Sequence, residues 1–234
     1  MRRARGGEWV PEGIDRDPSV SVVIPARNES EYIGETLESL AAADTERLEE
    51  VLVVDGDSTD DTAAIARERG ATVLSQSGRG IADARNRGAT MATGSWLAFL
   101  DADTVVHPSY VPTMLAFVER SGLAAASCYC RITGPVRARV MQTTINRLFP
   151  RLDRPVLPGF NTFVHREAFD AADGFPDVPN EDTAFSRRLA AEFPTGYCPV
   201  TLVESSGRRI ASDGLTGTLY HYVRLDVGRV CAAR

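Results

Sequence analysis

Short apolar runs alternate with amphipathic segments along the first half of the chain. Four runs are rich in β-branched and other apolar residues, as buried strands are, and they cover residues 19–26, 49–56, 71–77 and 95–103. The segments between them repeat apolar residues every three or four positions, the spacing of a helix, and cover residues 30–43, 58–70 and 81–94. Strands that alternate with helices predict right-handed βαβ units, a mostly parallel sheet and therefore an α/β fold.

Residues at the predicted helix ends agree with this pattern. Asn28 or Ser30 precedes the first helix and Ser58 or Thr59 the second, and each has a side-chain oxygen that is able to cap a helix N-terminus. Gly70 follows the second helix, as a C-terminal cap would.

The pattern becomes less regular after residue 104. Residues 107–122 and 135–149 have helical spacing, and residues 123–132 resemble an extended segment. We therefore expect a single domain over residues 19–234, with a parallel half followed by a half of mixed elements. Residues 1–18 contain no apolar stretch and predict a flexible tail.

Composition narrows the function. The 234 residues are 43% hydrophobic, which is enough for a sizeable core around a binding cleft, and the net charge of −6 does not favour a nucleic-acid partner. All 26 basic residues are arginine, so Schiff-base chemistry and a P-loop lysine are excluded. No CxxC pair and no apolar run of about 18 residues occurs. We expect a cytoplasmic protein that meets a membrane, if at all, from its surface.

Charged residues gather where the predicted strands end, which is where parallel sheets bind ligands. The fourth strand ends in Asp101 and Asp103, and in an extended segment two such residues point to the same side, about 6.5 to 7 Å apart at Cα. Paired carboxylates favour Mg²⁺ or Mn²⁺, whose shell is usually completed by waters and substrate phosphates. The alternative is that they only end the strand and cap a helix after Pro108.

Six motifs occur in one order along roughly residues 19–205: IPARNES, VVDGDSTDDT, ADARNRGA, FLDADT, GFNTFVHREAF with a following DGF, and NEDTAFSRRL. In this order they resemble the family 2 inverting glycosyltransferases of the GT-A fold. The second motif departs from the usual Asp-Asp-Gly-Ser because it reads Asp55-Gly56-Asp57-Ser58. The resemblance implies a Rossmann-like, mostly parallel central sheet flanked by helices. Residues 19–104 would be its nucleotide-binding half and residues 105–234 its acceptor-binding half.

The resemblance also implies a metal-dependent reaction and assigns roles to residues. A sugar would pass from a UDP- or GDP-sugar to a hydroxyl or lipid-phosphate acceptor in glycan or glycolipid synthesis, with Mn²⁺ or Mg²⁺ as the cofactor. Asp103 would bind the metal and the diphosphate, and Asp101 the ribose or the metal. Asp55 would accept a hydrogen bond from the base. The implied nucleotide-binding residues are Pro25, Ala26, Glu29, Asp55, Arg79, Arg85 and Asp101.

The motif NEDTAFSRRL supplies the implied catalytic carboxylates. Asp182 is the candidate general base, with Glu181 beside it, and it would take the proton of an acceptor hydroxyl. A lipid phosphate is already ionised, so with that acceptor Asp182 would only orient it. The alternative is an ordinary helix N-terminus capped by Asn180. His221 is a candidate for a further metal ligand.

Three other functions stay open. The string DADTV resembles the nucleophile motif of haloacid-dehalogenase-type phosphatases, although three strands precede it and the usual lysine is absent. A nucleotidyltransferase would need a glycine-rich loop where this chain has PARNE. A non-catalytic sugar-binding module would not need the metal, diphosphate and acceptor motifs together.

The acceptor is the least constrained partner. Arginines alternate with apolar residues over residues 136–154, as they do in helices that lie on anionic bilayers. The same pattern fits a core-packed helix with a solvated arginine face. A glycan acceptor, a lipid-linked acceptor and peripheral contact with the inner face of a membrane all stay open.

Overall fold

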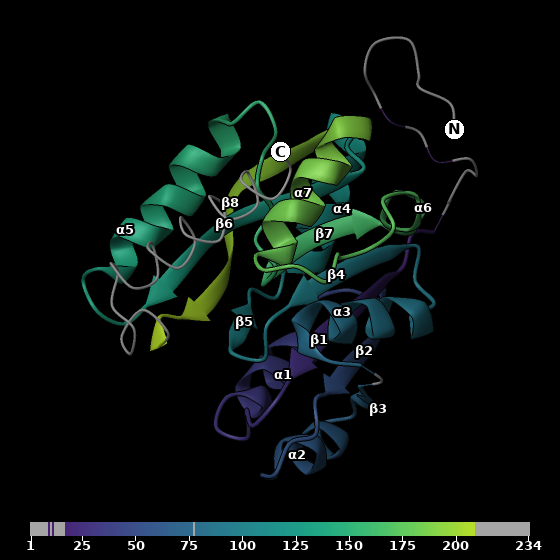
Figure 1. The fold of residues 1–234 in the computed structure, drawn as a ribbon, viewed down its shortest axis with the longest axis vertical. Helices are drawn as coiled ribbons and strands as arrows, with labels where there is room; N and C mark the ends of the chain where they lie inside the picture. The colour runs from purple at the N-terminus through teal and green to yellow at the C-terminus, as the bar shows by residue number, and fades with distance from the viewer. Residues whose placement is uncertain (1–8, 10, 12–16, 77, 209–234) are drawn as a thin grey trace.

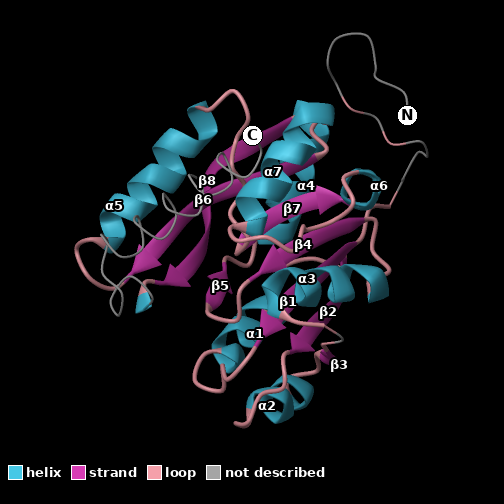
Figure 2. Cartoon of the chain, in the orientation of Figure 1, coloured by secondary structure: helices cyan, strands magenta, loops and turns pink. Residues whose placement is uncertain are grey.

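The computed structural model describes residues 9, 11, 17–76 and 78–208. One eight-stranded sheet, in the order β3-β2-β1-β4-β7-β6-β8-β5, runs through this part of the chain (Figures 1 and 2). Side chains alternate between its two faces, so that in β1 Val22 and Ile24 enter one apolar core and Val23 the other. Helices α1, α2, α4 and α5 contribute to the first core, and α3, α6 and α7 to the second.

The first half of the sheet is parallel, as the alternation of strands and helices predicts. Strand β1 pairs with β2 and β4, and β2 pairs with β3, all in parallel. The carboxyl ends of these strands therefore meet at one edge, where the charged loops lie. The elements are β1 (Val20–Ala26), α1 (Ile33–Ala41), β2 (Leu48–Asp55), α2 (Thr62–Glu68), β3 (Thr72–Ser75), α3 (Gly80–Met91) and β4 (Trp96–Leu100).

The second half is mixed, also as expected. Strand β7 is antiparallel to β4 and β6, β8 is parallel to β6, and β5 is antiparallel to β8. The elements are β5 (Thr104–Val106), α4 (Tyr110–Ser121), β6 (Ala125–Thr133), α5 (Ala138–Thr143), a π-helical turn (Thr144–Leu148), a 3₁₀ turn (Phe149–Arg151), β7 (Asn161–His165), α6 (Arg166–Ala171), α7 (Glu181–Glu192) and β8 (Thr195–Ser206).

The predicted helix caps are wrong for the N-termini. Helix α1 begins after Tyr32 and α2 after Asp61, and neither has a side-chain cap. The polar residues before them instead connect two loops, because Asn28 N donates to Ser58 Oγ (2.9 Å) and Thr59 N donates to Asn28 Oδ1 (2.8 Å). Gly70 follows α2 with a φ of 82°, as predicted for a residue that ends a helix.

The predicted tail, residues 1–18, lies mostly outside the described residues, and its flexibility stays a prediction. Within it, Trp9 packs onto the domain, since Trp9 N donates to Gly122 O (2.9 Å) and its ring lies edge-on to Trp96. Among the described residues, no helix has the length and apolarity needed to cross a bilayer.

Candidate active site

A cavity of about 580 Å³ opens at the carboxyl ends of β1 and β4. One wall is polar and includes Glu29, Asp101, Asp103 and Asp182. A second part of the lining, the apolar wall, comes from β6, from the helical segment after it and from the loop before β7. Its side chains are Ile132, Met141, Ile145, Phe149, Leu152, Val156 and Phe160. The cavity thus joins an acidic region suited to a charged, hydrogen-bonding ligand to a region suited to an apolar one.

The two aspartates after β4 lie in a turn rather than in an extended segment. Thr104 N donates to Asp101 O (3.1 Å), which closes the turn, and Thr36 Oγ1 of α1 donates to Ala102 O (2.8 Å). The expected extended geometry is therefore wrong, but both Asp101 and Asp103 line the same cavity. The turn therefore brings both carboxylates to the cavity, as an extended segment was expected to do.

Arg85 of α3 connects this turn with the start of α7. Its guanidinium is buried, with 2% of the side chain exposed, and it donates to Asp101 (3.0 Å) and to Glu181 (2.6 Å). Burial opposes the charge, but the carboxylates of Asp101 and Glu181 outweigh it and raise the pKa of Arg85. Arg85 is not among the residues that line the cavity; it lies behind the wall and ties Asp101 to α7.

The neighbouring carboxylates at the start of α7 point in different directions. Asp182 lines the cavity, and its oxygens accept from Gly159 N (3.2 Å) and Thr183 N (2.6 Å). Glu181 faces Arg85 instead. Burial and the charge of Asp182 raise the pKa of Glu181, although the Arg85 charge acts in the opposite direction. Asn180 before them has a left-handed backbone (φ 53°) and no side-chain capping bond, so the predicted cap is wrong.

Arg208 is a site residue that the sequence does not indicate. It follows β8, and its guanidinium contacts Glu29 (2.6 Å) and Asp103 (3.1 Å) while lying 4.5 Å from the centre of the Tyr32 ring. No quoted motif includes it. Only the folded chain brings residue 208 to the loops that follow β1 and β4.

The remaining predicted nucleotide-binding residues fall into two groups. Pro25 and Ala26 line the cavity at the end of β1. Asp55 lies beside Ala26 in the adjacent strand, outside the lining; Ser58 N donates to its Oδ2 (3.3 Å), and its Oδ1 is buried without a hydrogen-bond partner in the structure. Arg79 precedes α3, is exposed and does not line the cavity.

The acidic wall fits a divalent cation in its chemistry. Mg²⁺ and Mn²⁺ usually take one or two protein carboxylates and complete their shell with waters and phosphates, and Asp101 and Asp103 supply two. The Oε2 of Glu29, beside them, is buried and has no hydrogen-bond partner in the structure. The described residues contain no cluster of three or more His, Cys, Asp or Glu side chains that would hold a metal by themselves. His221 lies outside the described residues.

Residues 21–172 match the model of a family described as glycosyl transferase family 2. Among curated proteins, the chain is 35% identical over 231 residues to the succinoglycan biosynthesis protein ExoO of Rhizobium meliloti, covering 94% of this chain and 65% of that one. It is 32% identical over 163 residues to the low-salt glycan biosynthesis hexosyltransferase Agl6 of Haloferax volcanii, covering 68% of this chain and 38% of that one. The chain therefore spans less than two thirds of either relative.

Solved structures share the fold at lower sequence identity. S. aureus TarS superposes with a TM-score of 0.67 at 21% identity, over 81% of this chain and 60% of that one. The mannosyltransferase PcManGT from Pyrobaculum calidifontis, solved with GDP-Man and Mn²⁺, superposes with a TM-score of 0.66 at 24% identity, over 82% of this chain and 57% of that one. Glucosyl-3-phosphoglycerate synthase from Mycobacterium tuberculosis, solved with Mn²⁺ and UDP, superposes with a TM-score of 0.63 at 22% identity, over 87% of this chain and 80% of that one.

Proposed function

Since the chain belongs to glycosyl transferase family 2, we propose that it transfers a sugar from a UDP- or GDP-sugar to an acceptor, with inversion at the anomeric carbon. One observation carries the proposal: Asp101 and Asp103 of the motif FLDADT and Asp182 of the distant motif NEDTAFSRRL line one cavity at the carboxyl ends of β1 and β4. A donor site and an acceptor base must share one space for the reaction to occur. Family membership favours this function over a phosphatase, a nucleotidyltransferase or a sugar-binding module.

The donor nucleotide would occupy the part of the cavity next to the carboxyl ends of β1 and β4. Hydrogen bonds from Asn28 N to Ser58 Oγ and from Thr59 N to Asn28 Oδ1 connect the loops after β1 and β2, where the base would bind. Asp55 lies beside Ala26 of the cavity lining, and its buried, unpartnered Oδ1 would accept a hydrogen bond from a base that reaches it. Asp103, with Asp101, would hold Mn²⁺ or Mg²⁺, and such an ion offsets the charge of the leaving diphosphate. The solved neighbours that contain UDP or GDP-Man with Mn²⁺ agree with this choice.

The acceptor would be activated by Asp182. Its Oδ1 accepts from Thr183 N (2.6 Å) and Thr183 Oγ1 (3.4 Å), which fixes the carboxylate, while Oδ2 accepts only from Gly159 N and keeps a lone pair for a proton. Glu181 cannot share this task from its position, because its carboxylate is turned toward Arg85. Glu181 instead acts through Arg85 and Asp101, by holding α7 against the turn after β4.

The apolar wall of the cavity supports an acceptor with an apolar part, which a lipid-linked sugar or lipid phosphate has. A purely polar glycan would leave Met141, Ile145 and Phe149 in contact with water. We therefore favour the lipid-linked class among the acceptors. A cytoplasmic location stays a prediction from the sequence.

A donor screen tests the proposed function. The protein is mixed with UDP- and GDP-sugars, Mn²⁺ and a total lipid extract, and the released nucleoside diphosphate is measured together with sugar transferred to lipid. We expect release from one donor type. With a hydroxyl acceptor, such as that of a lipid-linked sugar, Asp182→Asn should lower the rate roughly 10² to 10⁴-fold, the usual contribution of a positioned base. A near-normal rate in this variant would remove Asp182 from the base role. No release from any donor would contradict the transferase activity.

A further inference from the structure

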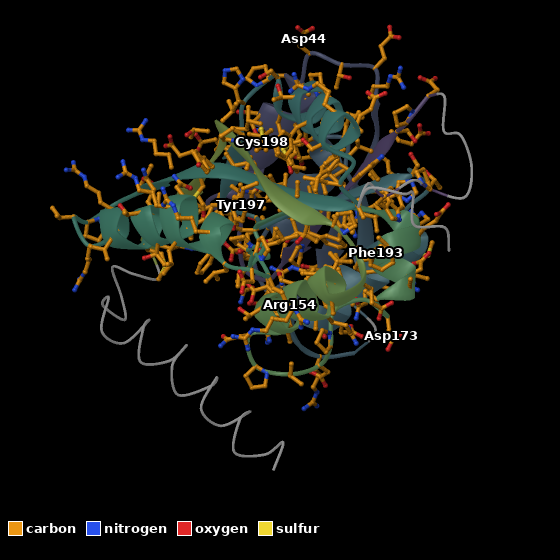
Figure 3. All side chains as sticks on the ribbon, turned by 90° about the horizontal axis from the view of Figure 1, so that it is seen from above. Asp44, Arg154, Asp173, Phe193, Tyr197 and Cys198 are labelled. Atoms are coloured by element: carbon orange, nitrogen blue, oxygen red, sulfur yellow. The ribbon has the colours of Figure 1, made fainter. Side chains whose placement is uncertain are left out.

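We propose that the segment of residues 136–154, here called the basic ridge, docks on an anionic lipid bilayer and places the apolar wall of the cavity at the membrane surface. The proposal rests on the proposed function because it names where the lipid part of the acceptor enters. The ridge consists of α5, the π-helical turn, the 3₁₀ turn and the residues up to Arg154. Helix α5 lies at the upper left of the molecule in Figure 1, away from β2 and β3, and Figure 3 labels Arg154, the last residue of the ridge.

The outer face of the ridge exposes apolar side chains. Half of the eight large hydrophobic residues that are exposed in the described part of the chain lie within residues 136–152. Single exposed apolar residues are ordinary on protein surfaces, but a concentration of this kind marks an interaction site. The four residues and their exposed fractions are Val136 at 77%, Val140 at 50%, Leu148 at 54% and Leu152 at 40%.

The same face is strongly basic. Residues 136–154 contain five arginines and one acidic residue, Asp153, for a charge of +4, whereas the whole chain carries −6. The rest of the chain therefore sums to −10, so the ridge is a basic segment in an otherwise acidic chain and complements an anionic surface. The arginines are all exposed: Arg137, Arg139, Arg147, Arg151 and Arg154. Exposed apolar residues interleaved with arginine are typical of helices that lie in a membrane interface.

The inner face of the ridge forms part of the proposed acceptor site. Ala138 and Ile145 are buried in the core, and Met141, Ile145 and Phe149 line the cavity. Leu152 both lines the cavity and has 40% of its side chain exposed, so the apolar surface continues from the outer face into the cavity. A lipid tail that leaves the bilayer at the ridge would enter the cavity past Leu152.

Charge favours a bilayer over a protein partner as the occupant of the ridge. A bilayer that contains anionic lipids presents a continuous negative surface, which can meet the arginines at residues 137, 139, 147, 151 and 154 together with the apolar side chains exposed among them. Each basic residue near an anionic membrane strengthens binding about fivefold. Three basic residues together therefore strengthen binding to an anionic membrane roughly a hundredfold.

Vesicle co-sedimentation tests the proposal. The full chain is mixed with vesicles of phosphatidylcholine alone or of phosphatidylcholine and phosphatidylglycerol in equal parts. We expect binding to the second type only, and loss of binding as salt is raised. The triple variant Arg139→Gln, Arg147→Gln, Arg151→Gln should bind roughly a hundredfold more weakly, and Val136→Ser with Val140→Ser should also weaken binding.

A matched triple variant controls for net charge. Arg67→Gln, Arg120→Gln, Arg131→Gln removes the same charge from exposed positions outside the ridge and should bind vesicles normally. Equal losses in the two triple variants would overturn the proposal, as would no binding of the unchanged protein to anionic vesicles. Binding of the donor nucleotide, measured on the same samples, separates this failure from failure of the proposed function, because the ridge arginines do not line the cavity.

Discussion

Replacing Arg85 with glutamine should destabilise the protein and should do so more at neutral than at acid pH. The guanidinium is 2% exposed and pairs with Asp101 and Glu181, which are 29% and 16% exposed. Removing one partner of a buried ion pair costs about 3 to 5 kcal/mol because a charge is left without compensation. Since both carboxylates keep some contact with water, we expect a value near the lower end, about 3 kcal/mol.

The pH dependence follows from Glu181. Burial raises the pKa of Glu181 in the folded protein, and the Arg85 charge limits that rise. Without Arg85 the pKa rises further, so the folded variant takes up a proton that the unfolded chain, with a pKa of about 4.5, does not hold. The stability of the variant therefore falls as the pH increases through this window. The difference from the unchanged protein should be smaller at pH 5 than at pH 8.

Urea unfolding at the two pH values measures both effects. A loss of about 3 kcal/mol in a chain of this size corresponds to a fall in Tm of roughly 6 to 12 °C. The control is Arg67→Gln, an exposed arginine of α2, which should change stability by less than about 0.5 kcal/mol. A loss below about 1 kcal/mol, or the same loss at both pH values, would refute the account of Arg85 as the link between Asp101 and α7.

Three further predictions concern single contacts. Gly159→Ala places a Cβ 2.3 Å from Arg85 Nη2 and should cost about 1 to 3 kcal/mol in urea unfolding; an unchanged midpoint would show that Arg85 moves freely. Asp60 should titrate at a pKa of about 2 in NMR spectra because the Thr62 hydroxyl donates to it, and Thr62→Val should move that pKa back toward 3.8; no movement would contradict this cause. Arg208→Gln removes a cation from Asp103 and should raise the affinity for Mn²⁺ alone about fivefold in calorimetry, whereas weaker binding would mean that Arg208 assists the ion.

The regular first half of the fold could be predicted from the sequence because local spacing decides it. Residues with strand or helix periodicity between 19 and 104 form the expected elements within a few residues. The helix caps could not be predicted from the sequence. The side chains of Asn28 and Ser58 are able either to cap a helix or to join two loops, and local sequence does not distinguish the two roles. That choice depends on how close the loops after β1 and β2 come in the folded chain.

The motifs of the candidate site predict which residues come together there, but not the backbone conformation and contacts that bring them together. The Asp-x-Asp motif indicates a shared location for Asp101 and Asp103, but a turn and an extended segment both satisfy it. Arg85 could be assigned to the nucleotide site from its motif, yet its two carboxylate partners lie 16 and 96 residues away in sequence. Arg208 has no local signal, because only the β8 register brings it to Asp103.

Calorimetric titration with UDP and GDP, with and without Mn²⁺, tests the central claim most directly. The claim is that the turn after β4 binds the donor and that α7 serves the acceptor. We expect one nucleotide to bind only with the metal, Asp103→Asn to abolish that binding, and Asp182→Asn to leave the dissociation constant nearly unchanged. Circular dichroism checks that both variants are folded. Binding that is unaffected by Asp103→Asn, or no binding of either nucleotide with Mn²⁺ present, would contradict the account.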